Sequence, residues 1–472
     1  MAKEKMPDVL VLLPGITGSV LKRRDGEVMW GFSAKAGLRA LFSRGSAIVD
    51  ALKLGDDSDP EREVLGDGIT ADALIPDLHL IPGLWKIDGY TKIRETIARY
   101  FEVKEGQNYI ELPYDWRRDN RAAAWKLKRR AHEWLKTWRD SSGNTDAKLI
   151  LIAHSMGGLV SRYFLECLEG WKDTRALVTY GTPYRGSLNA VNTLANGEKK
   201  GPFGALDLTP LTDSLTSIYQ LMPIYESYDA GDGAGLRRVG ETEGIPGINA
   251  RRAAEALAFH REIEAKVNEN NERHGPKRYG IFPIVGTHQP TNQSARLAGG
   301  RVVVEQSRKG EDRSGDGTVP RDSATPIEYK DMPMFAATRH GSLQNADATL
   351  TQLNGILTNL YFDIGDLRKG DANPGQAHLS LEVEDLYWEG EPINLRARAD
   401  REVSGLRATL VNADTGAEVA SRVLAGDPDG WQQGELGAVP AGFYRVVVGG
   451  GDSVAPVADV FEVLDARTLE AL

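Results

Sequence analysis

The clearest pattern of apolar and polar positions runs from Lys148 to Val160. Apolar residues through Ala153 predict a buried strand, and the turn residues His154-Ser155-Met156-Gly157-Gly158 then interrupt it. After this turn the apolar residues recur at helical spacing, in two adjacent rows. The stretch therefore predicts a strand, a tight turn that carries Ser155, and an amphipathic helix.

Strands and helices alternate in the same way along most of the chain. The pattern predicts strands at 8–13, 108–113, 175–180, 279–285 and 301–306, and helices at 90–101, 118–139, 249–274 and 347–360. Such alternation is typical of an α/β fold built on a parallel sheet. In two segments, 30–85 and 201–235, the apolar residues show no sustained periodicity. A lid over an acyl-chain site and an irregular covering layer are both consistent with them, and both interpretations stay open.

The pattern of apolar and polar residues changes after a polar linker at 366–376. Beyond it, short alternating runs such as Leu379–Val383 and Phe443–Val448 are separated by turn residues. This spacing predicts an antiparallel β-sandwich of immunoglobulin-like architecture. We therefore expect an α/β domain at 1–365, with lid segments near 30–85 and 201–235, and a small all-β domain at 377–472.

Composition narrows the classes of function and of cellular compartment. The 472 residues carry a net charge of −10 and a pI near 5.5, which argues against a nucleic-acid partner because phosphate binding needs a basic surface. Cys167 is the single cysteine, so an internal disulfide is impossible. No apolar window reaches the ~20 residues that a bilayer span needs, and Val9–Leu13 is too short for a signal-peptide core. We expect a soluble cytoplasmic protein.

The turn at Ser155 resembles the nucleophile elbow of α/β-hydrolases, G-x-S-x-G, with Ala153 in place of the first glycine. Small residues are needed there because a side chain two positions before or after the serine would strike the neighbouring backbone. The alternative is a strand–helix turn with an incidental serine.

A serine nucleophile needs a positioned base, and the base needs an orienting carboxylate. Asp316 lies between two glycines after a predicted strand, and His340 is followed by a glycine. The chain order Ser155, Asp316, His340 is that of α/β-hydrolases, so we predict these three as the catalytic triad.

Other residues of the same types remain as alternatives. His288 is the competing base, and Asp312 or Asp322 is the competing acid. We expect His154 to face away from the serine, and His260 to lie on an outer helix.

The loop Pro14-Gly15-Ile16 directly follows the first predicted strand. In α/β-hydrolases a loop after an early strand and the residue after the nucleophile each supply a backbone N–H to the oxyanion hole. The candidates are therefore the N–H groups of Ile16 and Met156, although the Pro-Gly loop is also consistent with a plain turn.

Several motifs in order resemble the lecithin:cholesterol acyltransferase-like family of lipases and acyltransferases. They are Leu13-Pro-Gly-Ile-Thr-Gly-Ser19, Pro113-Tyr-Asp-Trp-Arg117, Ala153-His-Ser-Met-Gly-Gly158, Tyr180-Gly-Thr-Pro183, Tyr219-Gln-Leu-Met-Pro223 and Gly315-Asp-Gly-Thr-Val-Pro320. The resemblance covers roughly residues 8–360 and implies an α/β-hydrolase fold, ester chemistry, and the same triad and oxyanion hole. We interpret Asp115 and Arg117 of the second motif as a structural ion pair. The sandwich is not part of the family core.

The sequence predicts a serine hydrolase of the lipase or phospholipase type, which cleaves or transfers an acyl group through an acyl-enzyme. No cofactor or metal is expected. Expected partners are a lipid or other acyl ester, a transient membrane surface, and a protein bound through the sandwich. Two alternatives stay open: an esterase, thioesterase or amidase on a non-lipid substrate, and a partner-regulated effector recruited through the sandwich.

Overall fold

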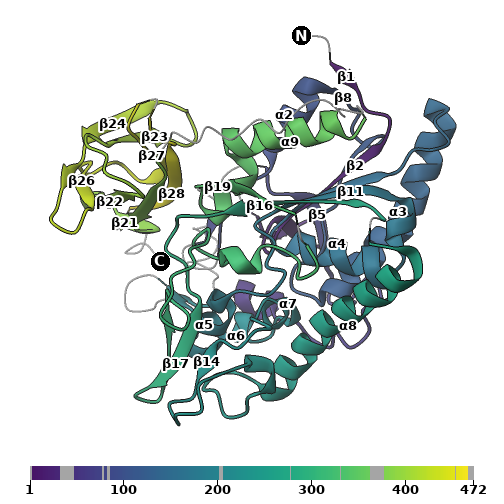
Figure 1. The fold of residues 1–472 in the computed structure, drawn as a ribbon, viewed down its shortest axis with the longest axis horizontal. Helices are drawn as coiled ribbons and strands as arrows, with labels where there is room; N and C mark the ends of the chain where they lie inside the picture. Colours follow the sequence, from purple (N-terminus) through teal and green to yellow (C-terminus); the bar gives the residue numbers. More distant parts are fainter. Residues whose placement is uncertain are drawn as a thin grey trace.

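The computed structural model describes residues 3–31, 47–76, 79–81, 85–200, 206–276, 278–329, 331–361, 377–451 and 453–465. A large α/β domain lies beside a smaller all-β domain formed by the C-terminal part of the chain (Figure 1). Among the described residues, no helix is both long enough and apolar enough to cross a membrane.

The α/β domain is built on a parallel sheet that runs through its centre (Figure 1). Within the described ranges its strands follow the order β19 (Met334–Ala336), β16 (Gly280–Gly286), β11 (Thr174–Tyr180), β10 (Leu149–His154), β2 (Val9–Leu13) and β9 (Tyr109–Glu111). Every pair of neighbours is parallel. All residues of β2 and β10 are buried, as expected for interior strands that are covered on both faces.

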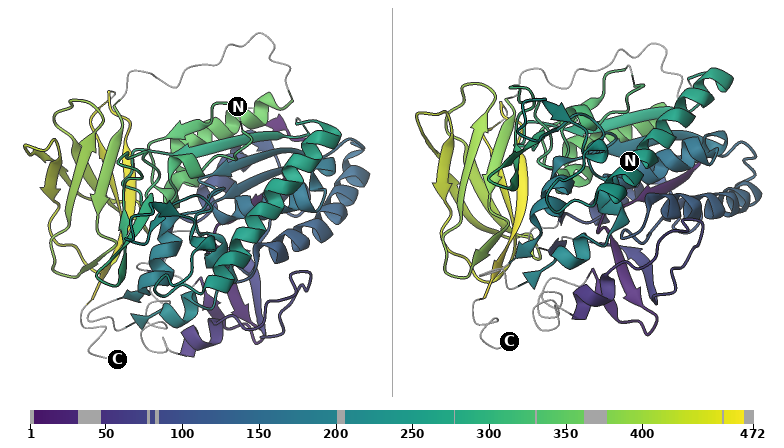
Figure 2. Two further views of the ribbon diagram at one scale, coloured as in Figure 1. Left: turned by 60° about the horizontal axis from the view of Figure 1, so that its bottom comes forward. Right: turned by 90° about the horizontal axis from the view of Figure 1, so that it is seen from below.

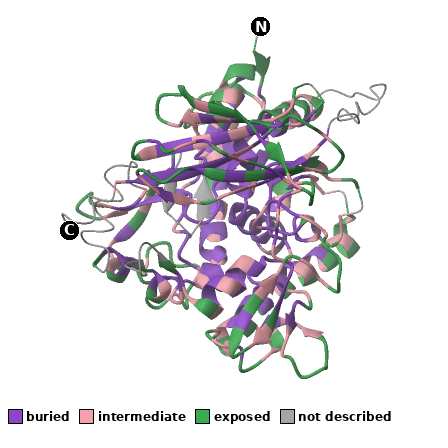
Figure 3. Ribbon diagram, turned by 90° about the vertical axis from the view of Figure 1, so that its left-hand side faces the viewer, coloured by how far each residue is buried: buried purple, intermediate pink, exposed green. Residues whose placement is uncertain are grey.

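Helices cover both faces of this sheet, and alternate residues of each strand point to opposite layers. Leu10 and Ile150 pack in one apolar cluster with residues of α2 (Thr91–Tyr100) and α9 (Asp347–Asn359). Their chain neighbours Val11 and Leu151 join the opposite cluster, with residues of α3 (Asn120–Ser142), α4 (Met156–Cys167) and α8 (Ala250–His274). The buried residues accordingly concentrate around the sheet (Figure 3).

Helix α8 is exposed along one side only. The Asn249 side chain accepts a hydrogen bond from the backbone N–H of Arg252 and so caps the start of the helix. His260 lies on this outer helix, as expected, but on its buried face: it is 3% exposed, and its Nε2 lies 2.7 Å from the Gln220 carbonyl oxygen. Burial lowers the pKa of His260 to about 4.

The first predicted lid segment, 30–85, includes part of a small antiparallel sheet of β3 (Ser19–Arg23), β4 (Val28–Trp30) and β5 (Ile69–Leu74). A hairpin of β6 (His79–Ile81) and β7 (Trp85–Ile87) follows. Residues 47–52 are helical, whereas 32–46 lie outside the described residues. Its lid function stays a prediction.

The second predicted lid segment, 201–235, contains short elements. These are β13 (Leu206–Asp207), which pairs with β12 (Lys199–Lys200), then α6 (Thr209–Thr212), α7 (Thr216–Gln220) and β14 (Tyr228–Asp229). The remaining short elements of the domain are β1 (Glu4–Lys5), β8 (Phe101–Glu102), α5 (Leu188–Asn196) and the 3-10 helices η1 (Gly170–Asp173), η3 (Val239–Glu241), η4 (Arg321–Ser323) and η5 (His340–Asn345).

The predicted strand at 301–306 does not belong to the main sheet. It is β18 (Arg301–Glu305), which pairs with β17 (Ser294–Ala298) in a side sheet that also holds β14 and β15 (Leu236–Arg237). The run of three valines suggests a strand covered on both faces, but Val303 is 38% exposed. The edge strand next to β16 in the main sheet is β19, which the apolar pattern did not predict.

The C-terminal domain contains two sheets around one apolar core, as a sandwich requires. One sheet has the order β20 (Leu379–Val383), β22 (Asn394–Ala399), β26 (Gln432–Glu435), β25 (Ala425–Gly426). The other has the order β21 (Leu386–Trp388), β28 (Val457–Leu464), β27 (Gly442–Gly449), β23 (Arg407–Asn412), β24 (Glu418–Val423). The prediction of a purely antiparallel domain is wrong at one pair, because β21 and β28 run parallel.

Candidate active site

Ser155 occupies the turn between β10 and α4, and its backbone has φ 50° and ψ −123°. A positive φ is uncommon for a residue with a side chain, and it is the strained conformation that a nucleophile elbow imposes. Gly157 explains why the turn needs small residues. A Cβ atom built there would lie 2.5 Å from the Pro14 carbonyl oxygen and 2.9 Å from that of Leu13. Ala153 is fully buried in β10.

The structure brings Ser155, His340 and Asp316 together from three separate loops. The Ser155 Oγ lies 2.8 Å from His340 Nε2, and His340 Nδ1 lies 2.7 Å from Asp316 Oδ2. Because a carboxylate only accepts hydrogen bonds, Nδ1 carries the proton of a neutral imidazole and Nε2 accepts from the serine. The three residues are between 1% and 6% exposed.

Backbone groups of its own loop fix the carboxylate of Asp316. Oδ1 accepts the N–H groups of Thr318 at 2.9 Å and Val319 at 2.7 Å, which leaves Oδ2 to His340. The sequence predicted that Asp316 directly follows a strand. In the structure it pairs instead through an isolated bridge with Gln289, which lies shortly after β16. Gly181, with φ +54°, allows this approach, because a Cβ there would lie 2.7 Å from Oδ2.

The alternative base and acids lie elsewhere. His288 stacks on His378 of the C-terminal domain, with the ring centroids 4.9 Å apart. Asp312 accepts from the side-chain amide of Gln293, and Asp322 pairs with Arg313. Each of these groups is thus engaged away from the serine.

The two candidate oxyanion donors belong to different segments, Met156 to helix α4 and Ile16 to the loop after β2. Met156 begins helix α4, so its N–H is one of the amides that a helix leaves without an internal acceptor. Ile16 lines a cavity together with Ser155. The loop before it packs directly on the serine, since a Cβ on Gly15 would lie 2.9 Å from Ser155 Cβ.

A buried hydrogen-bonded chain connects this loop to the histidine loop. The Gly15 N–H donates to the Tyr90 hydroxyl at 2.8 Å, and that hydroxyl lies 3.0 Å from His154 Nδ1. His154 Nε2 lies 3.1 Å from the carbonyl oxygen of His340, which can only accept. Nε2 therefore carries the proton, and Tyr90 donates to Nδ1.

His154 thus joins two loops of the site, whereas its position beside Ser155 in the sequence predicted only that it faces away from the serine. Burial, and secondarily the neighbouring His340, lower the pKa of His154 to about 3, so the ring stays neutral. Neither the contacts of His154 nor those of Tyr90 have a local sequence signal.

The cavity beside Ser155 is largely apolar. Its lining residues are Ile16, Ser155, Pro183, Ser187, Asn189, Ala190, Leu221, Thr318 and Val319. An apolar wall next to a nucleophile suits the hydrocarbon part of a substrate.

A second cavity uses parts of the same two loops, 183–187 and 318–322. It is lined by Arg185, Tyr225, Gln293, Arg308, Arg313, Pro320 and Asp322. Arg313 pairs with Asp322 at 2.8 Å, and Arg308 lies over the Tyr225 ring. Within the described residues the buried Nε of Arg185 has no hydrogen-bond partner. Arg313 also pairs with Glu311 at 2.9 Å, so Arg185 and Arg308 are the lining cations that favour an anionic group.

The C-terminal domain contacts Gln289, which pairs with Asp316, and Arg339, which precedes His340. The Gln289 side chain donates to the Leu379 carbonyl at 3.0 Å, and the Arg339 Nη2 donates to the Leu381 carbonyl at 2.7 Å. The Arg339 Nε also lies 3.1 Å from a carboxylate oxygen of buried Asp459, in an orientation that makes an ion pair without a hydrogen bond.

A further ion pair joins Arg445 of β27 to Asp88, whose N–H donates to the Gly341 carbonyl. The strand β28 lies on the side of the sandwich next to the α/β domain (Figure 2). The sandwich therefore contacts the loop around His340 directly through Arg339 and indirectly through Asp88.

The predicted ion pair of the Tyr-Asp-Trp-Arg motif is confirmed. The Arg117 guanidinium binds both carboxylate oxygens of Asp115, at 2.9 and 2.7 Å, and contacts Asp67 at 2.8 Å. Its side chain is fully buried.

Comparison with known proteins bears on the chemistry of this site. A sequence model of the family described as lecithin:cholesterol acyltransferase matches residues 85–236. The lysosomal phospholipase A and acyltransferase of Homo sapiens is 29% identical over 126 residues, which are 25% of this chain and 29% of that protein. Its counterpart in Rattus norvegicus is 29% identical over 142 residues, which are 28% of this chain and 32% of that protein.

The chain thus spans about a third or less of the length of these curated relatives. Among solved structures, the mature lipase BlEst2 of Bacillus licheniformis is 12% identical and covers 74% of this chain and 91% of its own, with a TM-score of 0.31. The resemblance expected from the sequence motifs is confirmed by the family match. Over residues 85–236 this chain is similar to the family described as lecithin:cholesterol acyltransferase.

Proposed function

We propose that this protein is a serine hydrolase of the lipase type, which cleaves or transfers an acyl group of a lipid-like ester. The observation that carries the proposal is the continuous hydrogen-bonded series from Ser155 Oγ through His340 to Asp316, at 2.8 and 2.7 Å. A serine hydroxyl at its own pKa is a weak nucleophile, and such a series is the means by which proteins activate it.

In the proposed reaction, His340 Nε2 takes the proton of Ser155 as Oγ attacks the ester carbonyl. Asp316 holds the ring in the required tautomer and stabilises the imidazolium that forms. The N–H groups of Ile16 and Met156 receive the developing oxyanion, and each such donor contributes about 10²–10³ in rate. His340 then protonates the leaving alcohol, and water or a second alcohol attacks the acyl-enzyme.

The lipid-like substrate rests on the two cavities. The apolar lining beside Ser155 suits an acyl chain, and the arginines of the second cavity suit an anionic headgroup. The matched relatives are named as enzymes that act on phospholipids and transfer acyl groups. Hydrolysis and transfer share the same acyl-enzyme, so both belong to the proposal.

The decisive experiment is labelling by a fluorophosphonate probe combined with turnover of p-nitrophenyl esters. Wild type and the exposed-serine control Ser141→Ala should label and turn over alike, and Ser155→Ala should do neither. Asp316→Asn should retain the fold and lose about 10⁴ in kcat, because the histidine adopts the wrong tautomer. Labelling of Ser155→Ala at the wild-type rate would remove the catalytic assignment.

A second experiment separates lipid from non-lipid substrates. Lipid-like substrates predict faster turnover of phospholipid vesicles than of soluble short-chain esters, with a preference for anionic lipids that Arg185→Gln weakens. Equal turnover of both, or a soluble thioester or amide as the better substrate, would support a non-lipid hydrolase instead.

For the C-terminal domain we propose an immunoglobulin-like sandwich that braces the active site. Its contacts with Gln289, Arg339 and Asp88 support an intramolecular role. The alternative is recruitment of a protein partner. Deletion of residues 376–472 separates the two, since bracing predicts a lower kcat for the purified domain, whereas recruitment predicts unchanged turnover. A cytoplasmic location stays a prediction, and the matched relatives are named as lysosomal.

A further inference from the structure

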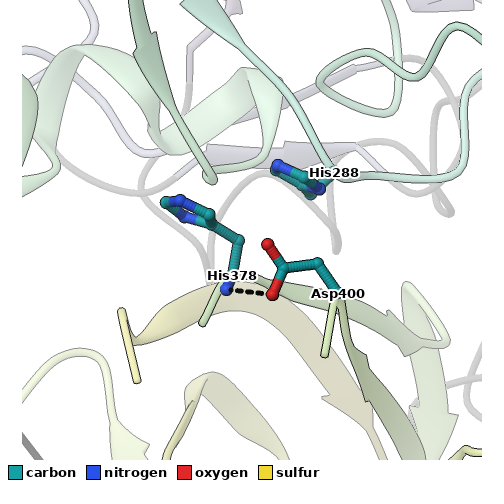
Figure 4. Close-up of side chains that lie close together, drawn as sticks. All are labelled: His288, His378 and Asp400. Atoms are coloured by element: carbon teal, nitrogen blue, oxygen red, sulfur yellow. Dashed lines mark hydrogen bonds between the residues drawn. The ribbon is translucent and has the colours of Figure 1, made fainter. Parts of the chain in front are cut away.

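Three side chains with metal-binding atoms meet where the two domains touch. His288 follows strand β16 of the α/β domain, while His378 and Asp400 flank the paired strands β20 and β22 of the sandwich (Figure 4). One ligand atom from each lies within 4.8 Å of the other two. The three residues are distant in sequence, so only the tertiary structure unites them.

The geometry leaves a shared space between the three groups. The imidazole rings of His288 and His378 are nearly parallel, with an interplanar angle of 7° and centroids 4.9 Å apart. One carboxylate oxygen of Asp400 accepts the backbone N–H of His378 at 3.1 Å, and the other points toward the space between the two rings (Figure 4).

One of the two rings has a nitrogen that a metal ion would satisfy. The Nδ1 atom of His378 is buried and has no hydrogen-bond partner among the described residues. A buried nitrogen without a partner is unfavourable, and a metal ion would satisfy it.

Backbone contacts hold the ligands in place across the domain junction. The N–H of His288 donates to Ser314 Oγ at 2.6 Å, and the Ser380 hydroxyl of the sandwich donates to the His288 carbonyl. One cation competes with a metal for the carboxylate, because Arg401 donates to Asp400 at 3.3 Å.

We propose that His288, His378 and Asp400 bind a divalent transition metal of the zinc class and thereby join the two domains. Imidazole nitrogens with one carboxylate suit zinc, whereas calcium and magnesium prefer oxygen ligands. Two imidazole rings and one carboxylate leave room for water in the remaining positions. The residue after His288 is Gln289, which binds both the sandwich and the loop of Asp316.

The test is calorimetric titration of Zn²⁺ into the full chain after chelator treatment. Wild type and the control His132→Ala, an exposed histidine on α3, should each bind one ion saturably. His288→Ala, His378→Ala and Asp400→Asn should each raise Kd at least about tenfold, because loss of a ligand exceeds the loss that outer-shell changes cause. Zn²⁺ should raise the thermal unfolding midpoint of wild type and of His132→Ala, but not that of the three ligand variants. Mg²⁺ and Ca²⁺ should not raise the midpoint of wild type.

Wild type that binds no Zn²⁺, or three variants that bind it as tightly as His132→Ala, would overturn the proposal. An equal rise of the midpoint with Mg²⁺ would overturn the zinc-class assignment. Should a variant fail to fold by circular dichroism, the visible spectrum of Co²⁺ with wild type decides. Bands distinct from those of aqueous Co²⁺ support imidazole ligation, and an unchanged aqueous spectrum contradicts it.

Discussion

At the residue scale, two buried side chains connect the loops of the candidate site. Tyr90 and His154 form a buried bridge between the Gly15 loop and the carbonyl of His340. Under the proposed function this bridge sets the separation of the oxyanion loop from the base, and small displacements of catalytic groups are costly in rate.

We expect Tyr90→Phe to reduce kcat with little change in KM and to lower the free energy of unfolding by about 1–3 kcal/mol. The physical reason is that both the Gly15 N–H and His154 Nδ1 then lack a partner in a buried region. Steady-state kinetics and chemical denaturation measure the two effects. Tyr100→Phe, at an exposed position, is the control, and equal behaviour of the two variants would refute a role for the Tyr90 hydroxyl.

At the scale of elements, the junction of β10 and α4 is constrained by backbone atoms rather than by flexible side chains. Gly157 faces the carbonyl oxygens of Leu13 and Pro14, which belong to the end of β2 and the loop after it. Those atoms cannot move without moving the oxyanion loop. The turn therefore does not tolerate a side chain at position 157.

Gly157→Ala should destabilise the protein by about 1–3 kcal/mol or more and abolish ester turnover, because the added Cβ overlaps backbone oxygens. Gly355→Ala is the matched control, since Gly355 lies in helix α9 with open space around it. That substitution should stabilise the helix by up to about 1 kcal/mol. Thermal unfolding and esterase assays of both variants test the contrast, which an active Gly157→Ala would contradict.

The loop that carries His340 should depend on its tether to the sandwich. Arg339→Gln removes the ion pair to Asp459 and the hydrogen bond to the Leu381 carbonyl, so we expect kcat to fall about tenfold while KM changes little. Asp459→Asn should reproduce part of the loss, and Arg24→Gln, in an exposed turn, should not. A rise in KM at constant kcat would instead indicate a role in substrate binding.

At the scale of the whole molecule, the sandwich contains a buried carboxyl group that makes stability depend on pH. Glu462 of β28 is 4% exposed, its Oε2 has no hydrogen-bond partner within the described residues, and burial raises the pKa of its carboxyl to about 8. Between its unfolded pKa near 4.5 and about 8, the folded state holds the proton more tightly than the unfolded state. Stability therefore falls as pH rises through this window, by up to about 5 kcal/mol.

Glu462→Gln should remove this dependence, because the amide is neutral at every pH. Urea unfolding at pH 5, 7 and 9 is expected to show a steeper loss of stability for wild type than for the variant. Glu418→Gln, at an exposed position of β24, should follow wild type. Parallel pH profiles for wild type and Glu462→Gln would contradict the raised pKa.

Some features followed from the sequence because they are local. The strand, turn and helix around Ser155 arise from contiguous apolar periodicity and from the small residues of the turn, and the structure has all three. The predicted run Leu379–Val383 has the same first and last residues as strand β20, because its alternating pattern is also local. The order of Ser155, Asp316 and His340 along the chain was also sufficient to select residues that the structure brings into hydrogen-bond contact.

Only the tertiary structure decided the rest. The apolar run at 301–306 predicted one of the last strands, yet which sheet contains β18 depends on its partners in the fold. Asp316 is positioned by Gln289 and Gly181, His154 by Tyr90 and His340, and the His288 cluster by a second domain. Apolar periodicity reports which face of an element is buried, but not which distant polar group lies opposite. The sequence by itself therefore determined the elements and the candidate nucleophile, and packing between distant segments determined their partners.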